Sequence, residues 1–463
     1  MTEPRSIHLI GIAGAGISAI ARLLLERGYR VSGSDRQLSP LSYELQQAGI
    51  RVYQGHSADH IAGADLVIRS SAIPDDNVEV QAARQAGIPV VKRSDFLGQL
   101  MADQVGIAVA GTHGKTTTTA MIAWMLTALG QDPSYIIGGV SLNLKNNAHA
   151  GRGSAFVIEA DEYDRTFLGL RPQVAVVTNI EHDHPDCYPT PEDFYQAFLS
   201  FARNVTPDGC LVAGVDDAGV RRLAGDLRQA PLQVITFGID SAEADWRADL
   251  LQEVAGAGYR FTALYQSESA ASLSLQAPGL HNVRNALAAL AVAQWLRLPL
   301  EAASRALSEF VGTSRRFEVR GEAAGVVVID DYAHHPTEIR ATLSAARQRY
   351  PDRRIWAVWQ PHTYSRTQAL FDQFVAAFES ADGVVVTEIF ASREASQIGK
   401  FSSQTVVTAM NHPRAFFIPS LPQVVDFLVE RLLPGDVLIV MSAGDADQVS
   451  AQLLKKLEER DYV

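Results

Sequence analysis

The sequence predicts an α/β protein that is divided into three domains. Short runs of β-branched residues alternate with stretches long enough for a helix, which is the pattern of parallel sheets covered by helices. This alternation restarts near residues 105 and 326, and a chain of 463 residues is too long for one hydrophobic core. We therefore expect domains at residues 1–102, 103–312 and 313–463.

The composition excludes several classes of protein. Fifty-two acidic residues against 40 Lys and Arg give a net charge of −12, so no overall positive field exists to attract nucleic acid or an anionic membrane. No apolar stretch approaches the roughly 20 residues of a membrane span, and we expect no export segment before the first strand. Two cysteines, Cys187 and Cys210, cannot form a disulfide framework. These features predict a cytoplasmic protein.

The first domain is expected to be Rossmann-like. Strand-like runs lie at residues 7–10, 29–32, 64–68 and 88–91, with a helix over 17–27. Three glycines, Gly11, Gly14 and Gly16, follow the first strand. Asp35 ends the second, so a dinucleotide fingerprint is nearly present. Ala13 replaces its second glycine, and a Cβ there obstructs the approach of a pyrophosphate. An NAD-dependent oxidoreductase stays open as a weakened alternative, beside a loop for another nucleotide's diphosphate and glycines that serve only packing.

A phosphate loop is predicted at the start of the central domain. The buried-strand run 105–110 precedes a Gly-rich turn and a helix expected over 115–129. Backbone N–H groups of such a turn bind phosphate oxygens, while Lys115 supplies a cation and Thr116 a hydroxyl for Mg²⁺. The loop is a shortened version of the general pattern, because Val109 stands where that pattern has a glycine. We expect a P-loop ATPase-type domain that binds ATP or GTP. The loop residues are Gly111, Thr112, His113, Gly114, Lys115, Thr116 and Thr117.

Carboxylates and histidines follow two later strands of this domain. A strand over 156–159 leads into four carboxylates within six residues, at positions 159–164. Their mutual repulsion favours a bound cation, and Glu159 is a sensible partner for Thr116 around Mg²⁺. A second strand over 174–178 is followed by further potential ligands, including His184. One metal with a base, or two metals, would fit this edge, although the acidic cluster alone is also typical of a solvated loop.

The remaining segments complete the two later domains. Alternating strands with polar breaks over 233–275 predict an antiparallel annex, and a helix over 282–296 ends before Pro299. The third domain is expected to be Rossmann-like, with strands at 326–329, 355–359, 383–387 and 437–441.

With these residues in place, the chain resembles the Mur ligase family over essentially its whole length. The resemblance depends on seven motifs that occur in the family's order. They lie at residues 111–119, 159–162, 179–184, 281–286, 314–317, 330–336 and 360–367. Within the family the chain is similar to the branch that adds L-alanine. The resemblance implies an ATP- and Mg²⁺-dependent ligase that joins L-alanine to the lactyl carboxylate of UDP-N-acetylmuramate through an acyl phosphate, with the three domains closing on the substrates.

The same resemblance implies roles for individual residues. The first domain would hold the UDP group, through Gly14, Ala15, Gly16, Ile17, Ser18, Asp35, His56 and Ser70. ATP would contact the phosphate loop together with Asn282, Asn285, Arg316 and Asp331. Thr116, Glu159 and His184 would bind Mg²⁺. Lys115, Glu159 and His184 would act in catalysis, with Tyr332, His334 and Arg366 of the third domain meeting the reacting carboxylate and the amino acid.

Some positions depart from the family pattern. Thr363 stands where the family usually has an arginine, so one cationic contact to the substrate is missing. Tyr163 stands where serine is common, and a tyrosine at this position also resembles the ligases that recycle a murein tripeptide. Those ligases are the alternative within the family. A nucleotide-dependent switch or scaffold without chemistry is a further alternative, and the sequence leaves a monomer and a homodimer both open.

Overall fold

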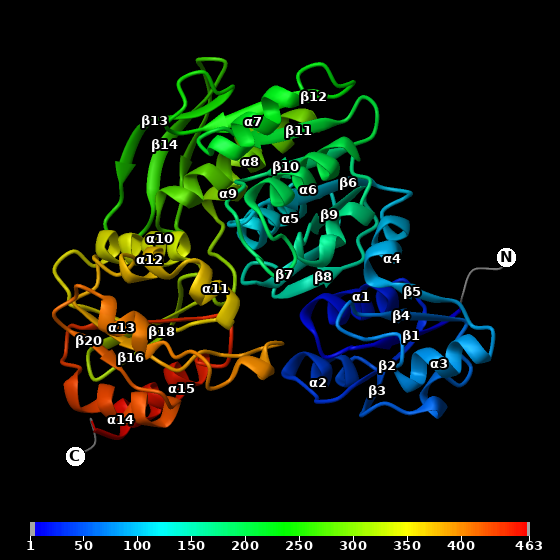
Figure 1. Ribbon diagram of the computed structural model, residues 1–463. Coiled ribbons are helices and arrows are strands. Elements are labelled where there is room, and N and C mark those ends of the chain that lie inside the picture. The colour runs from blue at the N-terminus through cyan, green and yellow to red at the C-terminus, as the bar shows by residue number, and fades with distance from the viewer. Residues whose placement is uncertain (1–4, 461–463) are drawn as a thin grey trace.

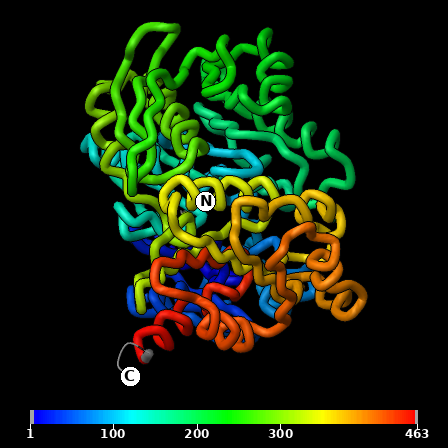
Figure 2. The backbone as a smooth tube through the Cα atoms, turned by 90° about the vertical axis from the view of Figure 1, so that its left-hand side faces the viewer, coloured from blue at the N-terminus to red at the C-terminus, as the bar shows by residue number. Residues whose placement is uncertain are grey.

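The computed structural model of the chain describes residues 5–460; residues 1–4 and 461–463, at the outer ends of the first and third predicted domains, lie outside the described residues. Within the described range the strands form three separate sheets of five, ten and six strands. Figure 1 shows each sheet in its own lobe, with the central lobe above the other two. Figure 2 shows the third lobe in front of the first. The predicted α/β class and three-domain architecture are confirmed, while the limits at 102 and 312 stay predictions.

The first lobe is a parallel sheet with strand order β3-β2-β1-β4-β5. Its elements are β1 (Ser6–Ile10), α1 (Ala15–Glu26), β2 (Arg30–Asp35), α2 (Pro40–Gln47), β3 (Arg51–Gln54), η1 (Ala58–Ile61), β4 (Leu66–Arg69), α3 (Val78–Gln85), β5 (Val90–Lys92) and α4 (Arg93–Leu100). Successive strands are added on one side of β1 up to β3 and on its other side from β4 onward, so the strand order reverses between β1 and β4. In sheets of this kind ligands bind at the carboxyl ends of the strands beside that point, which here is the glycine loop after β1.

The central lobe has the strand order β15-β14-β13-β12-β11-β10-β6-β9-β7-β8. Its strands are β6 (Val105–Ala110), β7 (Ser134–Ser141), β8 (Asn146–His149), β9 (Ala155–Glu159), β10 (Val174–Val177), β11 (Cys210–Gly214), β12 (Gln233–Gly238), β13 (Trp246–Glu253), β14 (Tyr259–Tyr265) and β15 (Glu268–Ser274). Its helices are α5 (Lys115–Ala128), η2 (Tyr163–Gly169), α6 (Pro191–Arg203), α7 (Ala218–Asp226), α8 (Leu280–Trp295) and α9 (Leu300–Ser308). The helices predicted over 115–129 and 282–296 are therefore present as α5 and α8.

Strand β6 lies in the middle of this sheet and explains how the phosphate loop is held. Its residues alternate between two cores: Ala108 and Ala110 face the core beneath α6, whereas Ile107 and Val109 face the core beneath α5 and α8. Both faces are covered, as expected for a continuous apolar run in a parallel sheet. The loop that follows is thus fixed at the carboxyl edge of a rigid layer.

The expectation of an antiparallel annex over 233–275 is correct for three of its four strands, since the pairs β13–β14 and β14–β15 are antiparallel. It is wrong for β12, which pairs in parallel with β11 and with β13 and so joins this segment to the main sheet. The helix α7 between β11 and β12 provides the crossover that a parallel pair requires, and the sequence pattern of β12 alone does not reveal its direction.

The third lobe has the strand order β16-β17-β21-β18-β19-β20, antiparallel only between β16 and β17. Its strands are β16 (Glu318–Ala323), β17 (Val326–Asp331), β18 (Ile355–Gln360), β19 (Gly383–Val386), β20 (Ala415–Phe417) and β21 (Val437–Ser442). Its helices are α10 (Pro336–Arg349), α11 (Tyr364–Ala369), α12 (Phe371–Val375), η3 (Ala395–Gln397), α13 (Gln404–Ala409), α14 (Leu421–Arg431) and α15 (Asp447–Arg460). Helix α10 starts at a capping box of His335 and Glu338 with Pro336 at its first position. The side chains of Thr337 and Glu338 in its first turn contact the central lobe.

Across residues 5–460, none of the helices combines the length and the apolar character that a bilayer crossing requires.

Candidate active site

The phosphate loop lies between β6 and α5, as predicted, and its backbone is tightly constrained. Gly111 has φ +142°, and a Cβ built there would lie 2.0 Å from Thr178 Oγ1 of the strand end after β10. Gly114 has φ +79°, and its Cβ would lie 3.0 Å from Asn285 Oδ1 on α8. Only glycine satisfies both the conformation and the space. The turn therefore fixes the N terminus of α5 at the carboxyl edge of the sheet, where a helix can bind a phosphate, while the N–H groups of Thr112 and His113 donate to Asn179.

Lys115 lies at the centre of a group of carboxylates. Its Nζ donates to Glu162 Oε1 at 2.9 Å and to the backbone oxygens of Gly111 and Thr112 at 2.5 and 3.0 Å. Burial works to lower the pKa of Lys115, but the carboxylates of Glu162 and Glu159 outweigh burial and raise it. The lysine is therefore a permanent cation beside the loop.

The residues predicted to bind Mg²⁺ surround the same point. Glu159 Oε2 accepts from Gly138 N at 2.8 Å, and burial raises the pKa of Glu159, although Lys115 and Thr116 act in the opposite direction. His184 Nε2 lies 3.5 Å from Glu162 Oε1, the same oxygen that accepts from Lys115. The second oxygen of Glu162 is buried without a hydrogen-bond partner. A divalent cation fits this donor set, because it would compensate a buried, incompletely satisfied group of carboxylates.

A second group of potential ligands does not fit a metal. One ligand atom each from His113, Glu181 and His335 lie within 4.8 Å of one another. However, the two ring nitrogens of His113 contact Glu181 at 2.9 Å and Glu338 at 3.2 Å. Burial works to lower the pKa of His113, but these two carboxylates raise it to about 9. An imidazolium has no lone pair for a metal, so this group is an ion-pair network.

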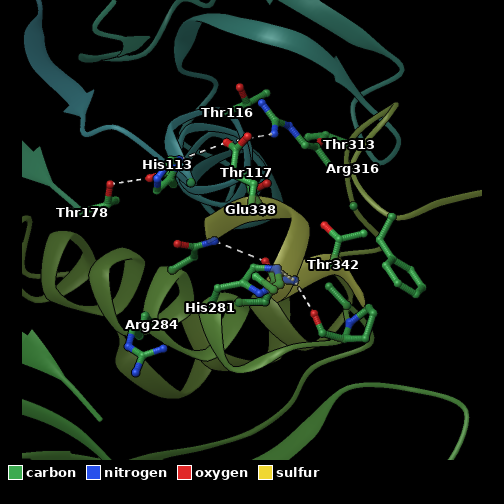
Figure 3. A pocket seen from close by; sticks show the side chains of 18 of the residues that line it. His113, Thr116, Thr117, Thr178, His281, Arg284, Thr313, Arg316, Glu338 and Thr342 are labelled. Atoms are coloured by element: carbon green, nitrogen blue, oxygen red, sulfur yellow. Dashed lines mark hydrogen bonds and ion pairs between the residues drawn. The ribbon is translucent and has the colours of Figure 1, made fainter. Parts of the chain in front are cut away.

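That network joins the central and third lobes. Glu181 follows β10, whereas Glu338 lies in the first turn of α10, and Thr337 Oγ1 also donates to Glu181 Oε1 at 2.8 Å. Figure 3 shows His113 and Glu338 from the two lobes beside the same pocket. The phosphate loop is thus in direct contact with the third domain.

Asp183 and Arg366 form a second contact between these lobes. Arg366 donates from Nε and Nη2 to the two oxygens of Asp183 at 2.8 and 3.1 Å, and both side chains are buried. Burial works to raise the pKa of Asp183, but Arg366 and His184 hold it well below its usual range. Asp183 thus binds two of the three guanidinium nitrogens of Arg366. The third nitrogen, Nη1, lies 3.1 Å from His362 Nδ1, so Arg366 also holds that ring in position.

Tyr332 and His334 lie together in the loop between β17 and α10. The Tyr332 ring lies beneath two guanidinium groups, those of Arg315 and Arg316, at 5.2 and 5.0 Å from its centroid. His334 Nδ1 donates to the Tyr332 carbonyl at 2.9 Å, which leaves Nε2 as an acceptor in the neutral ring. Burial lowers the pKa of His334 to about 4, so the ring is neutral at pH 7.

A cavity of about 360 Å³ extends from the phosphate loop between the central and third lobes. Figure 3 shows it between α5, α8 and α10. The predicted ATP residues Asn282, Asn285, Arg316 and Asp331 line it, and Phe317 and His281 also contribute to its wall. The loop residues that line it are His113, Gly114, Thr116 and Thr117, whereas Gly111, Thr112 and Lys115 do not. Asn285 Nδ2 donates to Asn282 Oδ1 at 3.2 Å. Burial raises the pKa of Asp331 to about 6, although the amides of Phe317 and Ala333 donate to its two oxygens.

The residues predicted to bind UDP gather at the glycine loop of the first lobe and do not line that cavity. A Cβ on Gly11 would lie 3.0 Å from the Cβ of Ser70, which brings Ser70 to the loop. Asp35 Oδ2 accepts from Ala13 N at 3.0 Å. The backbone N–H of the residue that replaces the fingerprint glycine is therefore already engaged. Ser18 Oγ donates to the Ala15 carbonyl inside α1, and His56 contacts Ser34 on β2.

Arg93 lies between the glycine loop of the first lobe and the acidic loop of the central lobe, and the sequence analysis did not predict this role. It donates to Asp161 Oδ2 at 2.9 Å, in the acidic loop after β9. A Cβ on Gly16 would lie 1.8 Å from its Nη1. A cavity of about 30 Å³ is lined by Gly16, Arg93 and Glu159 together. Glu338 and Glu79 were also missed; the spacing from His335 to Glu338 is that of a capping box and was the one available signal for Glu338.

The chain matches three described regions of one family. Residues 6–105 match the Mur ligase family catalytic domain, residues 109–293 the Mur ligase middle domain, and residues 315–444 the Mur ligase glutamate ligase domain. The UDP-N-acetylmuramate–L-alanine ligase of Salinibacter ruber is 41% identical over 457 residues, which cover 98% of this chain and 95% of that protein. The enzyme of the same name from Rubrobacter xylanophilus is 44% identical, over 97% of this chain and 100% of that one.

Solved structures resemble the whole fold. The crystal structure of UDP-N-acetylmuramate–alanine ligase from Thermotoga maritima superposes with a TM-score of 0.83 at 29% identity, covering 98% of this chain and 99% of that one. A murein peptide ligase from Psychrobacter arcticus superposes with a TM-score of 0.74 at 28% identity, with 98% of each chain covered.

Proposed function

Because the chain belongs to the Mur ligase family, we propose that it is an ATP-dependent ligase that joins L-alanine to the lactyl carboxylate of UDP-N-acetylmuramate in peptidoglycan precursor synthesis. The observation that carries this function is the identity of 41% and 44% to alanine ligases over nearly the full length of both chains. The phosphate loop, the carboxylates and the third-domain histidine supply the chemistry that such a ligase needs. The oxidoreductase and scaffold alternatives lose their support with the family membership.

The first chemical step is a phosphoryl transfer. A carboxylate does not react with an amine in water, because its oxygen is a poor leaving group. An oxygen of the lactyl carboxylate therefore attacks the γ-phosphorus of ATP, the bond to the β-phosphate oxygen breaks, and ADP leaves an acyl phosphate behind. Lys115 and Arg316 stabilise the charge that spreads over the transferred group.

The predicted metal residues fit this step. Thr116, Glu159 and His184 would hold Mg²⁺, which supplies charge neutralisation on the transferred phosphoryl group. Lys115, whose Nζ donates to Glu162 Oε1 at 2.9 Å, would place its charge beside the same phosphoryl group.

The second step forms the amide bond. The neutral amine of alanine attacks the acyl carbon, and phosphate leaves the tetrahedral intermediate. His334 presents Nε2 as an acceptor and is uncharged before the amine arrives, so it orients the amine and takes up its proton. Tyr332 orients His334 through its carbonyl. Arg366, held by Asp183, keeps His184 and His362 in place and acts on the substrates through these two rings.

Within the described residues Cys187 and Cys210 are both free thiols, which is in keeping with a reducing compartment, and we propose the cytoplasm. The oligomeric state stays a prediction of monomer or homodimer.

The test is release of ADP by the full chain with Mg-ATP, UDP-N-acetylmuramate and an acceptor. L-alanine should support turnover, with the product identified as UDP-N-acetylmuramoyl-L-alanine. Glycine and L-serine as acceptors measure how strictly the enzyme selects alanine. A murein tripeptide tests the recycling alternative, since this chain also resembles a murein peptide ligase. Turnover with the tripeptide alone would overturn the proposed acceptor, and absence of ADP with every acceptor would overturn the ligase activity.

A further inference from the structure

The first lobe contains a buried carboxylate that the proposed mechanism does not use. Glu79 lies in the first turn of α3, and its side chain is 0% exposed. Within residues 5–460 its charged contacts are to histidines, at His8, His56 and His60, and not to lysine or arginine. An isolated buried carboxylate is unfavourable unless several hydrogen bonds stabilise it.

Glu79 receives four such hydrogen bonds from the carboxyl edge of the sheet. Ser34 Oγ on β2 donates at 2.5 Å, and His60 Nδ1 on η1 donates at 2.7 Å. His56 Nδ1 and Ser57 N, in the loop after β3, donate at 3.1 and 3.3 Å. Burial works to raise the pKa of Glu79, but the histidine and serine hydrogen bonds outweigh burial and hold it at about 2. The carboxylate is therefore ionised and accepts every one of these bonds.

An ionised partner fixes the tautomer of His56. Since the carboxylate accepts, Nδ1 of His56 carries a hydrogen, and Nε2 of the neutral ring is then an acceptor. No contact to His56 Nε2 is found among the described residues, and the side chain is 11% exposed, so this nitrogen is available to a ligand. A phosphate oxygen is also an acceptor and would not pair with it.

The same carboxylate reaches the glycine loop through Ser34. The backbone oxygen of Ser34 accepts from Gly11 N at 2.8 Å and from Ile12 N at 3.1 Å. Glu79 thus holds together the ends of β2 and β3 at the crevice where the nucleotide half of the substrate is proposed to bind.

We propose that Glu79 is a positioning residue that holds His56 in its Nδ1–H tautomer, so that Nε2 accepts a hydrogen bond from a donor group of the substrate's nucleoside. This inference rests on the proposed binding of UDP-N-acetylmuramate in the first domain. The donor is either the imide N–H of the uracil or a ribose hydroxyl, because both can donate a hydrogen bond to Nε2. Glu79 does not touch the substrate in this scheme.

Calorimetric binding to the full chain tests the role of Glu79. Glu79→Gln keeps the size of the side chain but removes the charge that orders the tautomer. We expect UDP-N-acetylmuramate to bind about tenfold more weakly, with ATP affinity unchanged, because the hydrogen bond to one neutral partner is lost. Glu44→Gln is the matched control: Glu44 lies on α2 of the same domain, is 56% exposed and pairs with Arg22. Equal weakening of both ligands, or no weakening of UDP-N-acetylmuramate, would overturn the proposal.

The imidazole ¹⁵N resonances of His56 report the tautomer directly. The wild-type chain should show the Nδ1–H form, and Glu79→Gln should move it toward Nε2–H, a change that a merely structural role would not produce. An Nε2–H ring in the wild type would contradict the inference. This measurement on the wild-type protein keeps the test valid if the variant does not fold.

Analogues identify the donor. UDP methylated at N3 of the base lacks the imide hydrogen, and the 2′- and 3′-deoxy analogues each lack one hydroxyl. One of the three should bind the wild-type chain about tenfold more weakly than UDP. If all three bind as tightly as UDP, the acceptor role of His56 is wrong. A wild-type chain that ligates alanine but fails these tests loses only this inference, whereas a chain that neither binds UDP-N-acetylmuramate nor ligates alanine loses the proposed function.

Discussion

Two glycine loops occupy equivalent places in the first and central lobes. One follows β1 and opens α1, and the other follows β6 and opens α5. Each lies at the carboxyl edge of its sheet, so topology alone does not distinguish them. The side chains around them do. Lys115 and the carboxylates of Glu159 and Glu162 surround the central loop, whereas Asp35 closes the first loop by accepting from Ala13 N.

Individual glycines of the two loops differ in how closely they are packed. A Cβ at Gly111 would lie 2.0 Å from Thr178 Oγ1, whereas the nearest atom to a Cβ on Gly14 is the Gly11 carbonyl oxygen at 3.5 Å. Gly16 of the first loop is as tightly packed as Gly111, because its Cβ would lie 1.8 Å from Arg93 Nη1. The clearest difference between the loops is therefore the charge around the central one, which transfer of a phosphoryl group requires. The first loop needs only to bind. The fold provides the same kind of edge in both lobes, and the side chains at the neighbouring strand ends make the two edges chemically different.

The largest effect is expected for Lys115→Ala. Removing the cation that balances Glu162 and meets the γ-phosphate should lower kcat about 10³-fold, as loss of a preorganised charge contact does in other active sites. Steady-state ADP release measures it. Lys455→Ala, at an exposed position on α15, is the control and should leave kcat unchanged. Undiminished ligation by the Lys115 variant would mean that the central loop does not hold the reacting phosphate.

A pair of alanine substitutions tests the packing difference. Gly111→Ala places a Cβ at φ +142° and against Thr178 Oγ1, which donates to the His113 carbonyl at 2.6 Å. We expect a loss of about 3 kcal/mol in the free energy of unfolding. Gly14 has an ordinary backbone conformation, and a Cβ there would make only a van der Waals contact, so Gly14→Ala should change the free energy of unfolding by less than about 0.5 kcal/mol. Urea denaturation compares them, and equal destabilisation would show that the two loops are equally constrained.

The charge of His113 gives the central loop a pH dependence. Its pKa is raised from 6.5 to about 9 by Glu181 and Glu338, so its contribution to stability is fully present below pH 6.5 and is lost as the pH rises through about 9. We expect the free energy of unfolding to fall by about 3 kcal/mol between pH 6.5 and 9.5.

His113→Gln is the comparison for that pH dependence, because a neutral side chain cannot titrate. Denaturant titrations at both pH values should show a much smaller fall for this variant than for the wild type. His334 and His335, whose pKa values burial lowers to about 4, titrate outside this window and do not obscure it. An identical fall in both proteins would assign the dependence to another group.

The sequence predicted those parts of the site that lie at strand ends within one domain. Lys115, Thr116 and Glu159 could be grouped because parallel strands bring their carboxyl ends to one edge. The contacts between lobes could not. His113 and Glu338 are 225 residues apart, and Asp183 and Arg366 are 183 apart, so their pairing depends on how whole domains dock. Glu79 resembles an ordinary acidic residue in a helix's first turn, and only the three-dimensional position of β2 and the loop after β3 reveals its burial.

The smallest effect is expected for Ala13→Gly, which restores the dinucleotide fingerprint in the first loop. If the Cβ of Ala13 were the obstacle, the variant would gain affinity for NAD. The structure favours a different cause: the N–H of residue 13 donates to Asp35 Oδ2 at 3.0 Å, and a glycine would keep that bond. We expect no binding in a fluorescence titration with NADH and a change below about twofold in the affinity for UDP-N-acetylmuramate. Asp35→Asn, which weakens the same bond without changing the glycine pattern, should alter UDP-N-acetylmuramate binding more than Ala13→Gly does. NADH binding by Ala13→Gly would instead show that one methyl group separates the two kinds of loop.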